Sequence, residues 1–155
     1  MQARVNPFIA APDIIQPLLD LGAKVNDTNL EFSLCELVKI RASQINRCVN
    51  CLHMHTADAR TAGASEARIY LLNAWRESRL YTPRERAALA WTEALTQLAE
   101  TGAPDDVYNE LRAHFTAKEM VELTLLITTI NTFNRFAVGF RVVHPEDAKH
   151  AATAA

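Results

Sequence analysis

Glycine and proline are scarce in this chain, with four glycines and six prolines among 155 residues. An all-β protein needs many tight turns, and these two residues form a large share of them, so an all-β fold is not expected. Long apolar runs are also missing, since no stretch approaches the roughly 20 residues that a bilayer-spanning helix needs. Met1–Phe8 lacks the charged region and apolar core of a secretory signal. We therefore predict a cytoplasmic protein.

An excess of charge of one sign is likewise absent. The 16 Lys and Arg residues stand against 18 Asp and Glu residues, which gives a formal net charge of −2. No basic cluster indicates a nucleic acid or a membrane surface as a partner, and we expect neither. With 49% hydrophobic and 22% charged residues, the composition is typical of a globular protein, and the length suits one domain with one core.

The abundant residues, alanine, leucine and glutamate, favour helix. The sequence is therefore predicted to fold as an all-α, single-domain bundle of about six or seven helices. We expect residues 1–27 to form a lead-in segment with a short helix around Asp13–Leu21 that Gly22 ends. Residues 28–144 are predicted to form the helical domain, and residues 145–155 a disordered tail.

Local start and stop signals place the helices of this domain. Three segments have the form of a capping box, and two further residues are good N-caps: Thr28–Glu31, Thr82–Glu85 and Thr116–Glu119, with Asn46 and Ser65. The signals predict one helix over Cys48–Ala62, one from Pro83 to Gly102 and one from Pro104 to His114.

The last predicted helix is apolar on most sides from Met120 to Val138, which is typical of a helix in a bundle core or a subunit interface. Asn131, Asn134 and Arg135 lie inside this apolar stretch, and buried amides need hydrogen-bond partners. We expect the two asparagines to cap a neighbouring segment or to join a subunit contact.

The chain has three cysteines, of which Cys48 and Cys51 are close together and Cys35 stands apart. In a reducing cytosol, such a pair is more typical of redox chemistry or metal binding than of a structural staple. Cys35 is expected to behave as a small buried hydrophobe. Trp75 and Trp91 fall on apolar helical faces and are expected in the core.

Cys48, Cys51 and His55 have the i, i+3, i+7 spacing that places side chains on one face of a helix. At the start of a helix the backbone dipole favours an anion, so a thiolate is stabilised there. A thiolate attacks peroxide, His55 can take the thiol proton, and the second cysteine can resolve the sulfenic acid into a disulfide. Glu36, on the preceding helix, can hold the other ring nitrogen of His55 if the two helices pack antiparallel.

Two other interpretations of the cysteine pair stay open. Both cysteines and His55, with His53 or Glu36 as a fourth ligand, could bind zinc, although ligands at this spacing along one helix close a tetrahedron poorly. The pair could also be purely structural. His53 turns away from its neighbours on the helix and is expected at the surface or in packing.

The spacing Glu36-x11-Cys48-x2-Cys51-x3-His55 resembles the motif of the AhpD-like alkylhydroperoxidases, within the carboxymuconolactone decarboxylase superfamily. The resemblance spans about Leu30 to Arg141. Further segments that look similar are Leu72–Ser78, Arg84–Leu89, Trp91–Thr96 and Ile130–Arg135.

This resemblance implies a homo-oligomer, commonly a trimer or hexamer, that reduces hydroperoxides without a metal or an organic cofactor. Cys51 would be the attacking thiol and Cys48 the resolving one, with His55 and Glu36 as the proton relay. A dithiol, such as a lipoyl group or a thioredoxin-like protein, would be the reductant. The best-studied AhpD proteins carry a histidine where this chain has Asn50, which cannot shuttle a proton.

That departure keeps a second function open, a thiol–disulfide oxidoreductase or redox sensor that does not use peroxide. The decarboxylase branch of the superfamily acts on lactones without a cysteine pair. The presence of Cys48 and Cys51 argues against that branch, and a metal-binding helical protein is the remaining alternative.

Overall fold

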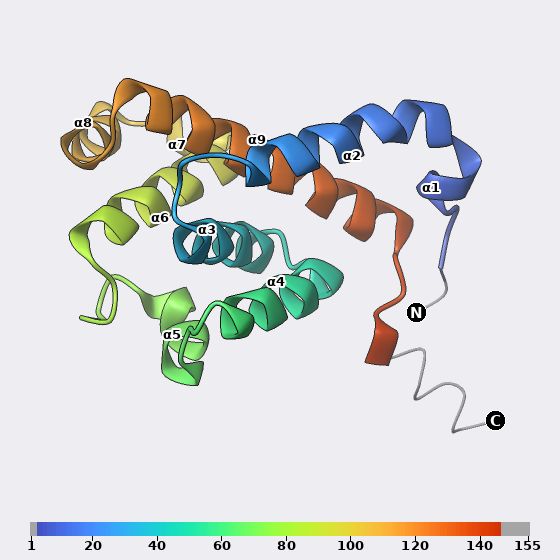
Figure 1. Ribbon diagram of the computed structural model, residues 1–155, viewed down its shortest axis with the longest axis horizontal. Coiled ribbons are helices and arrows are strands. Elements are labelled where there is room, and N and C mark those ends of the chain that lie inside the picture. The colour runs from blue at the N-terminus through green and yellow to red at the C-terminus, as the bar shows by residue number, and fades with distance from the viewer. Residues whose placement is uncertain (1–2, 147–155) are drawn as a thin grey trace.

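The structure, a computed structural model, describes residues 3–146, and this part of the chain consists of helices joined by turns (Figure 1). This architecture confirms the predicted all-α fold. The helices outnumber the expected six or seven because several comprise a single turn. They are α1 (Pro7–Ala10), α2 (Pro12–Asn26), α3 (Phe32–Ile45), α4 (Val49–Thr61), α5 (Glu66–Tyr70), the 3-10 helix η1 (Leu71–Ala74), α6 (Pro83–Thr96), α7 (Leu98–Thr101), α8 (Asp105–His114) and α9 (Ala117–Phe140).

Helix α3 lies at the centre of the bundle and contacts α4, α6 and α9 (Figure 1). Its apolar side chains enter both parts of the hydrophobic core. Leu34 and Val38 pack in the part shared with α6 and α9, whereas Leu37 and Ile40 pack in the part shared with α4, α5 and η1. Because α3 is covered on several sides, burial of its apolar residues is a main source of stability.

Three predictions about the core are confirmed. Trp75 and Trp91 are both buried, one in each part of the core. Cys35 is a free, buried cysteine packed in the same part as Trp91.

Most of the expected helix starts are present. Thr82 and Thr116 each form a complete capping box with the glutamate three residues later, and Ser65 caps α5. The helix expected from Pro83 to Gly102 is interrupted at Gln97, so that α7 forms a separate turn that ends at Gly102 with φ 63°.

The capping box expected at Thr28 does not form, because α3 begins at Phe32 with Glu31 as its N-cap. Glu31 is engaged elsewhere. Its carboxylate accepts hydrogen bonds from the Arg84 guanidinium, with Nε 3.0 Å from Oε1. The partner lies 53 residues away in the sequence, so a local pattern gave no sign of it.

Helix α2 is longer than the sequence predicts and packs against α9. The expectation that Gly22 ends this helix is wrong, since α2 continues to Asn26. Gly22 allows a close approach of the two helices, because a Cβ there would lie 3.1 Å from the Phe133 ring. Of the predicted tail, residues 147–155 lie outside the described residues, and 145–146 are helical.

Helix α9 has 24 residues and is the longest helix described. Despite its apolar composition, neither α9 nor any other helix within residues 3–146 has the length and hydropathy to cross a membrane. Its buried face packs on α2, α3 and α6 instead.

Candidate active site

The cysteine pair sits at the start of α4. Cys48 is the N-cap residue, and its Sγ accepts a hydrogen bond from the backbone N–H of Cys51 at 3.3 Å. The two cysteines form a disulfide with their Cα atoms 5.4 Å apart. Both are buried, with 1% and 5% of their surface exposed. The positive end of the helix therefore faces the sulfurs, which favours a thiolate in the reduced state.

Asn46 was expected to cap α4, but it ends α3 instead. Its side-chain Nδ2 donates hydrogen bonds to Oδ1 of Asn131 at 2.8 Å and to Oδ1 of Asn134 at 2.9 Å. Nδ2 of Asn134 donates in turn to Ser43 Oγ at 3.1 Å. The two asparagines of the last helix thus bind side chains at the end of α3 and in the loop that carries Cys48. The predicted cap does not form, because these bonds join side chains and not the backbone of a helix end, and a subunit contact stays a prediction.

We expect Asn134→Ala to lower the free energy of unfolding by about 2–4 kcal/mol, because Asn46 and Ser43 would lose a buried partner. Urea denaturation would measure the change. Thr128→Ala on the same helix is the control, since Thr128 is exposed and its hydroxyl donates to the carbonyl of Leu125 in its own helix. Equal stability of the two variants would contradict a supporting role for the asparagine contacts.

Glu36 is the buried acid of the site, with 1% of its surface exposed. Helix α4 packs closely on α3, and Nδ1 of His55 lies 2.9 Å from Oε2 of Glu36. The other carboxylate oxygen accepts a hydrogen bond from Lys39 Nζ at 2.7 Å. Sequence reasoning did not give Lys39 a role. The sequence signal for this pair was an acid and a base three residues apart, with apolar residues on either side of each.

These contacts keep the carboxyl group of Glu36 ionised. Burial acts to raise the pKa of its carboxyl group, but the hydrogen bonds from His55 and Lys39 outweigh burial, and the pKa lies below its ordinary value. An ionised carboxylate only accepts hydrogen bonds, so Nδ1 of His55 carries a proton. The lone pair of a neutral His55 is then on Nε2, which is free to accept a proton from a thiol.

A cavity of about 330 Å³ is lined by Cys51 and His55. Side chains of α2 and α9 form its apolar wall, among them Leu19, Phe133 and Phe136. Cys48 does not line this cavity. A small organic molecule in the cavity would therefore meet Cys51 and the imidazole before it met Cys48.

The candidate metal ligands that the structure brings together differ from the zinc ligands that the sequence suggested. The described residues bring together Glu36, His55 and Asp58, whose candidate ligand atoms lie within 4.8 Å of one another, and no cysteine belongs to this group. Lys39 already holds Glu36, and its positive charge would repel a cation. His53 is exposed, as expected, and its ring packs edge-on against His144 at a centroid distance of 4.5 Å.

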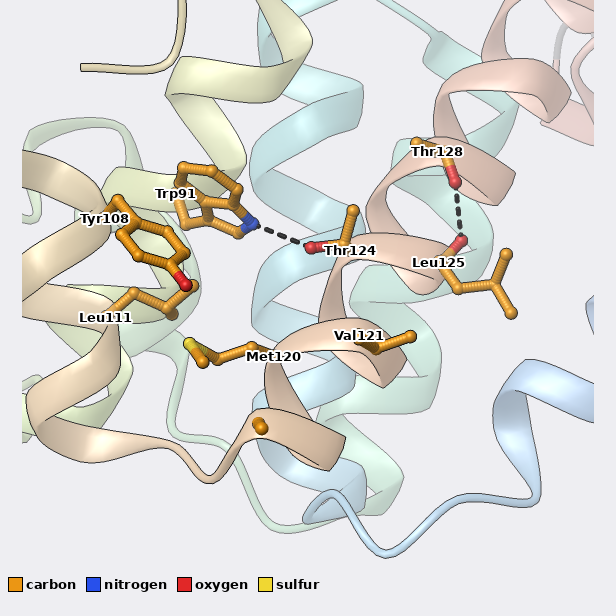
Figure 2. A pocket seen from close by; sticks show the side chains of 9 residues that line it. Trp91, Tyr108, Leu111, Met120, Val121, Thr124, Leu125 and Thr128 are labelled. Atoms are coloured by element: carbon orange, nitrogen blue, oxygen red, sulfur yellow. Dashed lines mark hydrogen bonds between the residues drawn. The ribbon is translucent and has the colours of Figure 1, made fainter. Parts of the chain in front are cut away.

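A larger cavity of about 440 Å³ lies between α8 and α9, with Trp91, Tyr108, Met120 and Val121 in its wall (Figure 2). Figure 2 shows the Trp91 indole N–H donating to Thr124 Oγ1, at 3.0 Å. The wall of this larger cavity contains no thiol, carboxylate or imidazole. Cys35 is equally unsuited to chemistry, because burial raises the pKa of its thiol to about 11. Of the candidate reactive groups, Cys51 and His55 therefore line one cavity, the Cys51 cavity.

Comparisons with known proteins agree with this fold. Residues 12–94 match the model of the carboxymuconolactone decarboxylase family. The uncharacterized protein YdfG of Bacillus subtilis is 38% identical over 138 residues, which cover 89% of this chain and 94% of YdfG. A crystal structure from Agrobacterium tumefaciens is 46% identical with a TM-score of 0.91 and covers 93% of this chain and 99% of that one. It is described as a protein of unknown function and a candidate antioxidant defence protein AhpD.

More distant structures share the fold alone. The debrominase Bmp8 has a TM-score of 0.78 at 17% identity, over 86% of this chain and 72% of that one. At this level of identity the likeness gives no information on substrate.

Proposed function

We propose that this chain is a thiol-dependent hydroperoxide reductase of antioxidant defence. The premise is that the chain belongs to the carboxymuconolactone decarboxylase family, within its AhpD-like group. One observation carries the proposal. An apolar cavity ends at a cysteine that is paired with a second cysteine and lies beside a histidine held by a buried carboxylate. That arrangement supplies a nucleophile, a resolving thiol and a base.

The first step would oxidise Cys51. His55 Nε2 takes the thiol proton, and the Cys51 thiolate attacks the terminal oxygen of the hydroperoxide. A sulfur–oxygen bond forms while the oxygen–oxygen bond breaks, and the alkoxide that leaves takes the proton back from His55. The products are an alcohol and a sulfenic acid on Cys51. Glu36 would stabilise the imidazolium between these two proton transfers.

The second step would form the disulfide. Cys48 attacks the sulfenic sulfur, a sulfur–sulfur bond forms, and the hydroxide that leaves takes the Cys48 proton to become water. The Cys51 N–H that donates to Cys48 Sγ would stabilise this second thiolate. An external dithiol, such as a lipoyl group or a thioredoxin-like protein, would then reduce the disulfide by thiol exchange. Assembly into a trimer or hexamer and a cytoplasmic location stay predictions.

A second candidate function rests on Asn50. This residue lines the cavity beside Cys51 and contacts the sulfur of Met54 at 3.8 Å. It cannot carry a proton, so His55 is the only base that the site places at the cavity wall. If one base does not suffice for peroxide reduction, the pair would serve a thiol–disulfide oxidoreductase or a redox sensor.

The experiment that tests the proposal is a thiol count on reduced protein before and after one equivalent of cumene hydroperoxide. We expect the wild type to lose two thiols per chain. Cys48→Ser should lose one and accumulate a sulfenic acid on Cys51 that dimedone traps. Sulfenic acid on Cys48 in a Cys51→Ser variant would reverse the proposed roles.

Loss of no thiols in the wild type would reject the peroxidase. A wild-type disulfide that nevertheless reacts with dihydrolipoamide would then support the oxidoreductase.

A further inference from the structure

A second, smaller cavity of about 70 Å³ adjoins the Cys51 cavity. The residues that line both cavities are Gly22, Asn26, His55, Ile130 and Phe133. The remaining wall of the small cavity includes Lys39 and Thr129. Four polar side chains, from four different helices, therefore surround a space that lies directly beside the proposed base.

We call this cavity of about 70 Å³ the chamber. The hydroxyl of Thr129 is the unusual group in it. Thr129 is buried, and its Oγ1 has no hydrogen-bond partner among the described residues. Threonines inside helices commonly donate to the carbonyl one turn earlier. Thr132 of the same helix does so, with Oγ1 3.0 Å from the carbonyl oxygen of Thr128. A buried hydroxyl without a partner is costly, so the unpaired Thr129 indicates a bound polar molecule.

Lys39 offers a donor to the same molecule. Its ammonium group has three N–H bonds. Two of them are used, toward Asn26 Oδ1 and Glu36 Oε1, both at 2.7 Å. The third has room in the chamber, where Lys39 forms part of the wall.

We infer that this chamber is a water-binding site that exchanges protons with His55, and that Thr129 positions the water. One water needs about 10–15 Å³ and two to four polar partners, so the chamber has room for water and enough partners to hold it. The water would accept a hydrogen bond from Lys39 and bond to the Thr129 hydroxyl. This inference rests on the proposed function, because it gives the water a part in that reaction.

The water would give the proton of the first step a second route, beside its direct return from His55 to the alkoxide. The proton that His55 takes from Cys51 has to reach the alkoxide when the oxygen–oxygen bond breaks. A water in contact with the imidazole can accept this proton and pass another on, so no proton is gained or lost. The charged groups around His55 are Glu36 and Lys39 of α3, the former at 2.9 Å, and Asp58 of its own helix at 3.9 Å. The side chains that α9 places at the chamber, Leu126, Thr129, Ile130 and Phe133, are uncharged.

Three variants of α9 test the inference. Thr129→Val keeps the shape of the side chain but cannot bond to water, Thr129→Ser keeps the hydroxyl, and Thr132→Val is a matched control outside the chamber. Crystal structures of the wild type and of both Thr129 variants would show whether water occupies the chamber. The rate of Cys51 oxidation by cumene hydroperoxide, measured by stopped flow from pH 5 to 9, would show what the water does.

We expect ordered water in the chamber of the wild type and of Thr129→Ser, and none in the chamber of Thr129→Val. Thr129→Val should oxidise about tenfold more slowly near neutral pH and show an altered pH profile, whereas Thr129→Ser and Thr132→Val should stay within about twofold of the wild type. A dry chamber in the wild type would overturn the inference, and so would an unchanged rate and pH profile in Thr129→Val. If the wild type ignores the hydroperoxide at every pH, the proposed function fails and the proton role fails with it, while the crystal structures still decide whether the chamber binds water.

Discussion

Replacing Cys51 with serine is expected to abolish catalytic hydroperoxide reduction, with a residual rate at least about 10³-fold below that of the wild type. The hydroxyl of serine is a far weaker nucleophile than a thiolate at neutral pH. Serine also leaves Cys48 without a partner for the disulfide that closes the cycle. The measurement is the steady-state consumption of cumene hydroperoxide with dihydrolipoamide as the reductant.

Two cysteine variants give this experiment its controls. Cys48→Ser should also fail to cycle, but it should still oxidise once, because Cys51 lines the cavity. Cys35→Ala should retain turnover, since Cys35 is buried and its raised pKa keeps the thiol protonated. Turnover by Cys51→Ser at the rate of the wild type would rule out the assignment of Cys51 as the nucleophile.

Glu36→Gln is expected to reduce turnover by about 100-fold and to destabilise the fold as well. Glutamine keeps the shape of the side chain but removes the negative charge that orients His55 and stabilises its protonated form. The same change leaves the buried Lys39 ammonium without its counter-charge. Breaking a buried ion pair in this way costs about 3–5 kcal/mol of unfolding free energy at neutral pH.

The pH dependence of stability separates this effect from a general packing defect. The pKa of Glu36 is lower in the folded chain than its ordinary value of 4.5. Its charge therefore stabilises the fold fully above about pH 4.5, and this contribution is lost as the pH falls through the lower folded-state pKa. The stability difference between the wild type and Glu36→Gln should then shrink in acid, as measured by urea denaturation at pH 3 and pH 7.

Glu66→Gln is the matched control for Glu36→Gln. It removes an acid whose partner, Arg60, lies 2.5 Å away in an ion pair that is about half exposed. Solvent screens such a pair, so stability and turnover should hardly change. A constant difference between the wild type and Glu36→Gln at both pH values would show that the Glu36 charge does not stabilise the fold.

The candidate reactive face of α4 could be predicted from sequence because its geometry is local. Cys48, Cys51 and His55 lie within eight consecutive residues, and helical periodicity alone places them on one side. Glu36 required one further assumption, that α3 and α4 pack on each other, and the structure meets it. The apolar helical faces on which Trp75 and Trp91 fall similarly predicted that both are buried, and they are.

The features that sequence reasoning missed depend on residues that are distant in the chain. Asn46 has the right character for a helix cap, but its side chain finds Asn131 and Asn134 across the bundle. Gly22 has the character of a helix stop, but it serves the contact between α2 and the ring of Phe133. In both cases tertiary contacts outweigh local propensity, and no pattern within a few residues identifies the partner.

The short span of the Cys48–Cys51 disulfide also limits how strongly the redox state of the protein affects its folding equilibrium. The two cysteines are only three positions apart. A cross-link over so short a loop restricts the unfolded chain by about 2 kcal/mol of loop-closure entropy, against about 4.7 kcal/mol for a 100-residue loop. Breaking the bond in each cycle would then shift the folding equilibrium by about 30-fold, far less than the shift of more than about 1,000-fold expected for a 100-residue loop. The Asn46 contacts hold the cysteine loop on α9 without any covalent link, so the reduced thiols would keep their places between turnovers.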